Sequence, residues 1–142
     1  MAQSGGELSS PFEEAVQLYQ QGKVAEAYQQ AQRAETWNKN QSGVLSAAYA
    51  DNLRLLSVIS ASLGNDSLAL QYVLQEIESR TLSGKTPSQP LAQAFQNASS
   101  LYLFLGDEKN AQRSAEQALS MLASVGASPE VLARLRLQTA KI

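Results

Sequence analysis

Few side chains in this sequence could carry out chemistry. The chain contains neither cysteine nor histidine, which removes thiol chemistry, the commonest general base and the commonest metal ligand. Two pairs of adjacent carboxylates, Glu13 with Glu14 and Asp107 with Glu108, remain as candidates for acid–base catalysis. Both pairs follow signals for the start of a helix, where negative side chains interact favourably with the helix dipole. We therefore interpret them as residues that stabilise helix starts.

One further segment, SGKT at residues 83–86, resembles the end of a phosphate-binding loop. The complete motif requires a glycine five residues before Gly84, where this chain has Ser79, and a strand before the loop. The sequence provides neither of these features. We therefore expect no nucleotide, no other cofactor and no metal ion.

The composition favours a single folded domain that does not bind nucleic acid. The chain has 142 residues, of which 44% are hydrophobic and 17% are charged, and this differs from the composition of disordered proteins. A net charge of −2 argues against a nucleic-acid-binding protein, whose surface would be basic. No apolar stretch reaches the roughly 18 residues that a membrane helix needs, so we expect no membrane insertion.

The first ten residues lack the basic start and apolar centre of a signal peptide. We therefore expect residues 1–10 to form a flexible tail and the protein to be cytoplasmic. A signal segment removed before this chain begins is an alternative.

The elements that position these side chains are predicted by a repeat of 42 residues. Three glycines recur at this interval, and each is followed five residues later by an alanine and preceded seven residues earlier by a small residue. These positions are Gly22, Gly64 and Gly106; Ala27, Ala69 and Ala111; and Ala15, Ser57 and Ser99. Self-similarity at a fixed period indicates a stacked array of structural units. The apolar spacing predicts two helices in each unit, with the glycine ending the first helix and small residues allowing the two helices to approach closely.

Start and stop signals place the helix boundaries. A capping box begins at Ser10, a similar start occurs at Ser128, and residues 82–90 are rich in helix breakers. The predicted helices are 11–21, 24–37, 42–63, 66–81, 89–105, 107–125 and 129–140. They form one domain, 11–142, with repeats at about 11–41, 42–85 and 86–127 and a capping helix at 128–142. In the 42-residue register, Lys141 takes the small-residue position of the capping helix.

This pattern resembles the tetratricopeptide repeat. The third copy matches the motif best, through Ser99, Tyr102, Gly106, Asp107, Ala111 and Ala118. Glu76 departs from the motif because it stands where a small residue is expected, and Glu14 departs because it stands where a large apolar residue is usual. The period of 42 rather than 34 is similar to the longer-helix variant found in kinesin light chain. The resemblance implies an all-α, right-handed superhelical array of three helix-turn-helix hairpins plus a C-terminal capping helix.

The same resemblance implies a protein-binding groove lined by the first helix of each repeat. The groove positions of the family correspond to Phe12, Val16, Tyr19, Gln20, Asp51, Arg54, Val58, Gln93, Gln96, Asn97, Ser100 and Phe104, with Ser62 beside them. We expect Phe12, Tyr19, Arg54 and Phe104 to be the anchors, with Arg54 solvated in the free protein. Packing of Tyr19 and Phe104 between hairpins is the alternative. Only Asn97 fits the positions that bind a chaperone's C-terminal carboxylate, so that ligand is not expected.

The function that the resemblance implies is non-catalytic binding of a protein or peptide, as an adaptor, scaffold or assembly factor, with homo-oligomerisation possible. Two alternatives from other classes are a peptide-sensing domain of a larger regulatory system and a small helical enzyme that uses carboxylates. Trp37, at the predicted end of the second helix, is interpreted as a packing residue, with a partner-binding anchor as the alternative. The basic face formed by Arg134, Arg136 and Lys141 is interpreted as a solvated cap, with docking of an acidic partner as the alternative.

Overall fold

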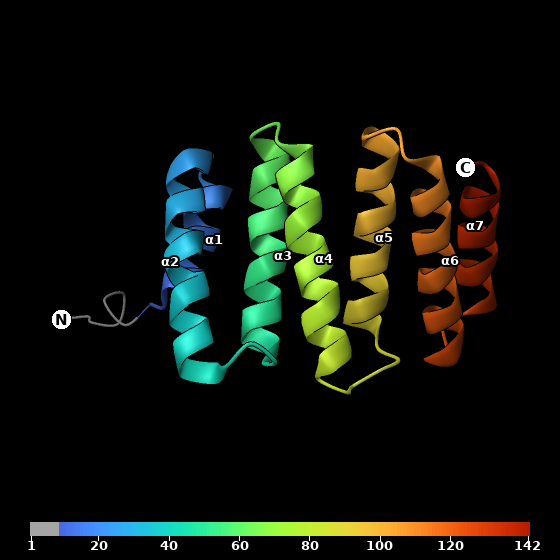
Figure 1. Cartoon of the computed structure of the whole chain (residues 1–142), viewed down its shortest axis with the longest axis horizontal. Coiled ribbons are helices and arrows are strands. Elements are labelled where there is room, and N and C mark those ends of the chain that lie inside the picture. Colours follow the sequence, from blue (N-terminus) through green and yellow to red (C-terminus); the bar gives the residue numbers. More distant parts are fainter. Residues whose placement is uncertain (1–8) are drawn as a thin grey trace.

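The computed structural model describes residues 9–142 and contains seven α-helices in that range (Figure 1). Their bounds are α1 (Pro11–Gln20), α2 (Val24–Ser42), α3 (Ala47–Ser62), α4 (Asp66–Leu82), α5 (Gln89–Phe104), α6 (Glu108–Ser124) and α7 (Pro129–Ala140). The predicted flexible tail falls largely on residues 1–8, which lie outside the described residues. Ser10 is the N-cap of α1, and its capping box with Glu13 is formed as predicted.

The helices form a solenoid in which each helix packs against the next one along the chain (Figure 1). The pairs α1–α2, α3–α4 and α5–α6 are hairpins, and α2–α3, α4–α5 and α6–α7 are the contacts between successive units. Such an arrangement is typical of repeat proteins, whose units contact mainly their neighbours. The predicted all-α helical array is therefore confirmed.

Two helix boundaries were predicted wrongly. Helix α2 continues to Ser42, five residues beyond its predicted end, and α3 begins at Ala47, five residues after its predicted start. Residues 38–42 contain no helix breaker, and α2 ends only where Gly43 adopts a φ of 87°. The side chain of Ser46 then caps α3 by accepting a hydrogen bond from the Tyr49 backbone N–H at 3.1 Å. Trp37 consequently lies inside α2, where it is 49% exposed, and not at a helix end.

The turns within the hairpins repeat the same backbone geometry at intervals of 42 residues. Gly22, Gly64 and Gly106 have φ values of 81°, 83° and 82°, which only glycine adopts without strain. Each glycine N–H bonds to the carbonyl three residues earlier, and the next N–H bonds to the carbonyl five residues before it. This is the Schellman arrangement, which satisfies the last carbonyls of the preceding helix. The periodic glycines of the sequence therefore mark three equivalent turns.

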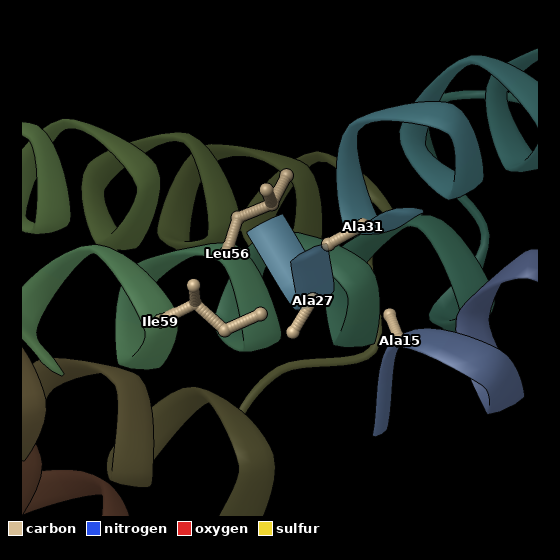
Figure 2. Close-up of a cluster of buried hydrophobic side chains, with 5 residues drawn as sticks. All are labelled: Ala15, Ala27, Ala31, Leu56 and Ile59. Carbon is tan, nitrogen blue, oxygen red and sulfur yellow. The ribbon is translucent and has the colours of Figure 1, made fainter. Parts of the chain in front are cut away.

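The core is built from small residues in the hairpins and larger ones between them. In the first cluster, Ala15, Ala27 and Ala31 on α1 and α2 pack with Leu56 and Ile59 from α3 (Figure 2). All five side chains are inaccessible to solvent. Burying a leucine or isoleucine side chain contributes about 1.5–3 kcal/mol. The alanines allow the helices to approach closely, and the larger residues then join one hairpin to the next.

The predicted contact between the small residues of each hairpin is confirmed in the second and third units. The Ser57 hydroxyl donates to the Ala69 carbonyl at 2.8 Å, and the Ser99 hydroxyl donates to the Ala111 carbonyl at 2.7 Å. Both bonds are buried and lie 42 residues apart. A serine at this position therefore fits the narrow seam and also has a hydrogen-bond acceptor across it.

The register predicted for the capping helix was wrong by one residue. The sheltered residues of α7 and of the segment after it are Val131, Leu132, Leu135, Thr139 and Ile142. The last four lie 41 residues after Leu91, Ala94, Ala98 and Leu101 of α5, and those four residues are buried. Of these, Ala98 and Leu101 belong to a hydrophobic cluster with residues of α4. Ala140, and not Lys141, therefore takes the position equivalent to Ser99.

The shift accompanies a shorter connection before α7. It comprises residues 125–128, whereas the corresponding connection before α5 comprises residues 83–88. Pro129 is the first residue of α7, but its partner in the 42-residue register, Pro87, lies in the loop. The side of α7 that carries Ala133, Arg136 and Ala140 is exposed.

Candidate protein-binding surface

The residues predicted to form a groove lie on the first helices α1, α3 and α5, and two hydrogen bonds hold these helices side by side. The hydroxyl groups of Tyr19 on α1 and Ser62 on α3 are 2.8 Å apart. Arg54 on α3 donates to the carbonyl of Pro90, at the start of α5, at 2.6 Å. The structure therefore brings predicted residues from different units next to one another.

The predicted residues differ in their exposure. Six are exposed, namely Gln20, Asp51, Val58, Gln93, Ser100 and Phe104. Six are half-buried, namely Phe12, Val16, Tyr19, Arg54, Gln96 and Asn97. The exposed residues are available to a partner, whereas those that are half-buried also contribute to the fold.

Tyr19 and Phe104, each expected to be either a partner-binding anchor or a residue packed between hairpins, differ in their environments. Tyr19 packs against the cluster of Ala15, Leu56 and Ile59 and bonds to Ser62. Its role is therefore structural, as in the alternative for that residue. Phe104 is 77% exposed, more than any other large hydrophobic residue of the described chain, and does not pack between hairpins. Phe104 remains the aromatic anchor candidate on this face.

Arg54 is not the solvated groove residue that was expected. Its Nη2 atom lies 2.7 Å from Oε2 of Glu76, a side chain that is inaccessible to solvent. Arg80 contacts the same oxygen at 2.8 Å through Nε and contacts Oδ1 of Asp51 at 2.7 Å through Nη2. Four charged residues of α3 and α4 thus form one network, and the bond from Arg54 to Pro90 extends it to α5. Arg54 therefore holds adjacent units together.

The electrostatics of this network are governed by the burial of Glu76. Burial raises the pKa of the Glu76 carboxyl group, and the hydrogen bonds and charges of Arg80 and Arg54 oppose that rise. Burial disfavours the charge on Arg80, but Asp51 and Glu76 outweigh it and raise the pKa of that group. Because no surface of Glu76 is accessible, a substrate could not reach this carboxylate. The network is suited to structural stabilisation rather than to acid–base catalysis.

A hollow lies where α5, α6 and α7 meet. Its volume is about 330 Å³. The residues that line it are Gln96, Ser99, Ser100 and Leu103 from α5, Ala115, Ala118 and Leu119 from α6, Leu135, Gln138 and Thr139 from α7, and Ile142 just after α7. None of these side chains is charged. We call this hollow the α5–α7 groove.

Sequence reasoning identified only Gln96 and Ser100 among these lining residues. The others were missed because the groove depends on how α7 docks on α6, and α7 was assigned the wrong register. The spacing of Leu135, Thr139 and Ile142, which follows one helical face, is the signal that could have identified its docking side.

Sites of other kinds are not found in the part of the chain that the structure describes. Within residues 9–142, no three aspartate or glutamate side chains gather as a metal site would require. Over the same range, no helix is both long and apolar enough to cross a membrane.

Comparisons with known proteins show similarity of fold. No protein-family profile matches the chain, and no curated protein matches it. Among solved structures, BtubC (BKLC) from P. vanneervenii is similar, with 19% identity over 91% of this chain and 52% of that chain and a TM-score of 0.81. A putative kinesin light chain of Podosopora anserina with TPR-like repeats matches with 17% identity over 95% of this chain and 68% of that chain, and a TM-score of 0.69. This chain thus spans about half the length of BtubC and shares its helical repeat fold.

Proposed function

We propose that this chain is a non-catalytic protein-interaction module that binds a segment of a partner protein on the face formed by its first helices. The observation that carries this proposal is the α5–α7 groove, which is about 330 Å³ in volume. One of the helices that line it, α5, also carries Phe104, whose side chain is 77% exposed. Groups of polar and apolar residues in a hollow of this size are typical of binding sites. The fold similarity to TPR-like repeats supports the proposal.

The chemistry of the groove favours an uncharged segment of the partner. Leu103, Leu119, Leu135 and Ile142 provide apolar surface, and Gln96 and Gln138 provide amide groups that can bond to a peptide backbone. A charged side chain placed there would lose hydration without finding an opposite charge. We expect an extended segment with aliphatic side chains to fit best.

The role proposed for the whole chain is that of a cytoplasmic adaptor, scaffold or assembly factor of the long-helix tetratricopeptide type. The three equivalent turns at intervals of 42 residues support that assignment. The buried and ion-paired state of Glu76 supports a role without catalysis.

The proposal can be tested by capture of proteins from native lysate, followed by mass spectrometry and binding measurements on the captured protein. Replacing Phe104 with alanine should weaken binding about tenfold or more, because interface energy concentrates in a few aromatic anchors. Since Phe104 is 77% exposed, the variant should fold normally. Trp37→Ala, which changes an exposed aromatic residue of the second helix α2, is the matched control and should bind as the parent does.

Two results would contradict this proposal. One is tight binding by the Phe104→Ala variant together with loss of binding by the Trp37→Ala variant, which would place the site on the second helices. The other is unchanged binding when Leu135→Asp introduces a charge into the α5–α7 groove, which would show that the groove is not occupied.

A further inference from the structure

An exposed apolar patch lies away from the α5–α7 groove. It lies along the edge of the solenoid that carries the α2–α3 and α4–α5 connections, at the bottom of Figure 1. Val44, Leu45 and Leu82 are 47%, 48% and 64% exposed there. Contiguous exposed apolar surface is a common feature of protein interaction sites. We call these three residues the loop-end patch.

The loop-end patch borders two hollows that adjoin each other. The first has a volume of about 260 Å³ and is lined by all three residues of the patch. The second has a volume of about 170 Å³ and lies toward the start of α5. Leu45 and Ser79 line both hollows. The patch is therefore a shaped surface, with Leu45 at its centre and a hollow on either side.

The two hollows carry opposite charges. Glu78 and Tyr49 line the first hollow. Burial raises the pKa of the Tyr49 phenol, and the nearby negative charges of Glu35 and Glu78 raise it further. Lys85 and Arg80 line the second hollow, and Arg80 is already paired with Glu76 and Asp51. Within residues 9–142, neither Glu78 nor Lys85 forms an ion pair. An acidic group and a basic group thus flank the apolar centre on opposite sides.

A surface with this arrangement is complementary to itself. A two-fold axis near Leu45 would place the acidic side of one copy against the basic side of the other, while the apolar residues pack at the centre. Two-fold interfaces use the same patch on both subunits, and they are the commonest in homo-oligomers. A partner of single charge would match only one of the two sides.

We propose that the loop-end patch, flanked by Glu78 and Lys85, is the interface of a symmetric dimer of this chain. In that dimer Glu78 of each copy faces Lys85 of the other, and the Leu82 side chains enter the facing hollows. The hollows beside the patch reach α5 only at Pro90, whereas the α5–α7 groove begins at Gln96, so the groove stays open in both copies. The dimer would therefore present two partner-binding grooves.

The dimer can be tested by sedimentation velocity across protein concentrations from micromolar to near-millimolar. Glu78→Lys alone and Lys85→Glu alone should each weaken self-association about tenfold, because each creates two like-charge contacts per dimer. The double variant Glu78→Lys with Lys85→Glu should restore association to within about threefold of the parent, because the opposite charges face each other again. Such a rescue is specific to a symmetric contact between these two positions.

The apolar centre is tested by a matched pair of leucines. Leu82→Ser should weaken self-association more than tenfold or abolish it, whereas Leu137→Ser on α7 should leave it unchanged. These leucines are 64% and 62% exposed, so both variants should keep the helical content and melting temperature of the parent.

Three results would overturn the dimer. The first is a parent protein that sediments as a monomer at every concentration. The second is a self-association that the double charge variant fails to restore. The third is a loss of association in Leu137→Ser but not in Leu82→Ser, which would place the contact on α7.

Discussion

Glu76 occupies a position that alanine takes in the other two hairpins. Ala34 and Ala118 are its counterparts at intervals of 42 residues, and all three side chains are buried. A carboxylate at such a position is costly unless opposite charges accompany it. Arg54 stands where the other repeats have Phe12 and Gln96, and Arg80 follows Glu76 by one helical turn. The second hairpin therefore replaces a small apolar contact with an ion-paired one.

The first prediction concerns Arg54. Changing Arg54 to glutamate should destabilise the protein by about 3–5 kcal/mol, because the buried Glu76 carboxylate loses one of its two arginine partners and is then poorly compensated. The Nη2 atom of Arg54 lies 2.7 Å from the Glu76 carboxylate, so the new side chain would also repel it. The free energy of unfolding, measured by chemical denaturation, checks this expectation.

The matched control for Arg54→Glu is Arg136→Glu on the exposed side of α7. That change should alter the free energy of unfolding by less than about 0.5 kcal/mol. Equal losses in both variants, or none in either, would contradict a structural role for Arg54.

Among the elements, the close approach of α5 and α6 depends on the absence of large side chains along their seam. Ala111 is fully buried, and its carbonyl accepts the hydrogen bond from the Ser99 hydroxyl at 2.7 Å. The same bond joins α3 to α4 through Ser57 and Ala69. The distance between the two helices of a hairpin is therefore set by these small residues.

The second prediction follows from this seam. Changing Ala111 to leucine should destabilise the protein by about 1–3 kcal/mol, because the added atoms have no space between α5 and α6. Ala123→Leu is the matched control, since Ala123 lies on the same helix but is exposed. Denaturation curves for the two variants should differ clearly, and an unchanged stability for Ala111→Leu would show that the seam can open without loss.

At the scale of the whole molecule, stability should be distributed unevenly along the solenoid. Helix α3 contributes eight buried residues, whereas α7 contributes none. Helix α3 packs on both α2 and α4, and the network of Arg54 joins it to α5 as well. Helix α7 packs closely on only one other helix, α6. Local opening in repeat proteins is easiest where a unit has fewest neighbours.

The third prediction concerns this distribution. Native-state hydrogen exchange, followed by mass spectrometry, should show the fastest amide exchange in α7 and the slowest in α3 and α4, because amides in well-packed elements exchange only after larger opening. Exchange in α7 as slow as that in α3 would contradict the distribution. It would indicate that another surface, such as a second copy, covers α7.

The sequence alone determined the hairpins. Glycine is required where φ is near +80°, so the three turns could be located from Gly22, Gly64 and Gly106. Ser10, Asn65 and Asp107 cap helices as expected, because capping involves residues only three positions apart. The seam of small residues repeats at a fixed distance from each glycine. These features depend on local chemistry, and local chemistry can be read from neighbouring residues.

Only the tertiary structure decided the surfaces. Arg54 was expected to be solvated because nothing near it in the sequence shows that Glu76 lies beside it. The α5–α7 groove needs residues from three helices, and its shape depends on how α7 docks against α6. The loop-end patch joins Val44 and Leu45 to Leu82, which lies 37 residues after Leu45 in the sequence. Contacts between distant residues depend on how whole helices dock, and docking depends on the sum of many small packing and charge terms.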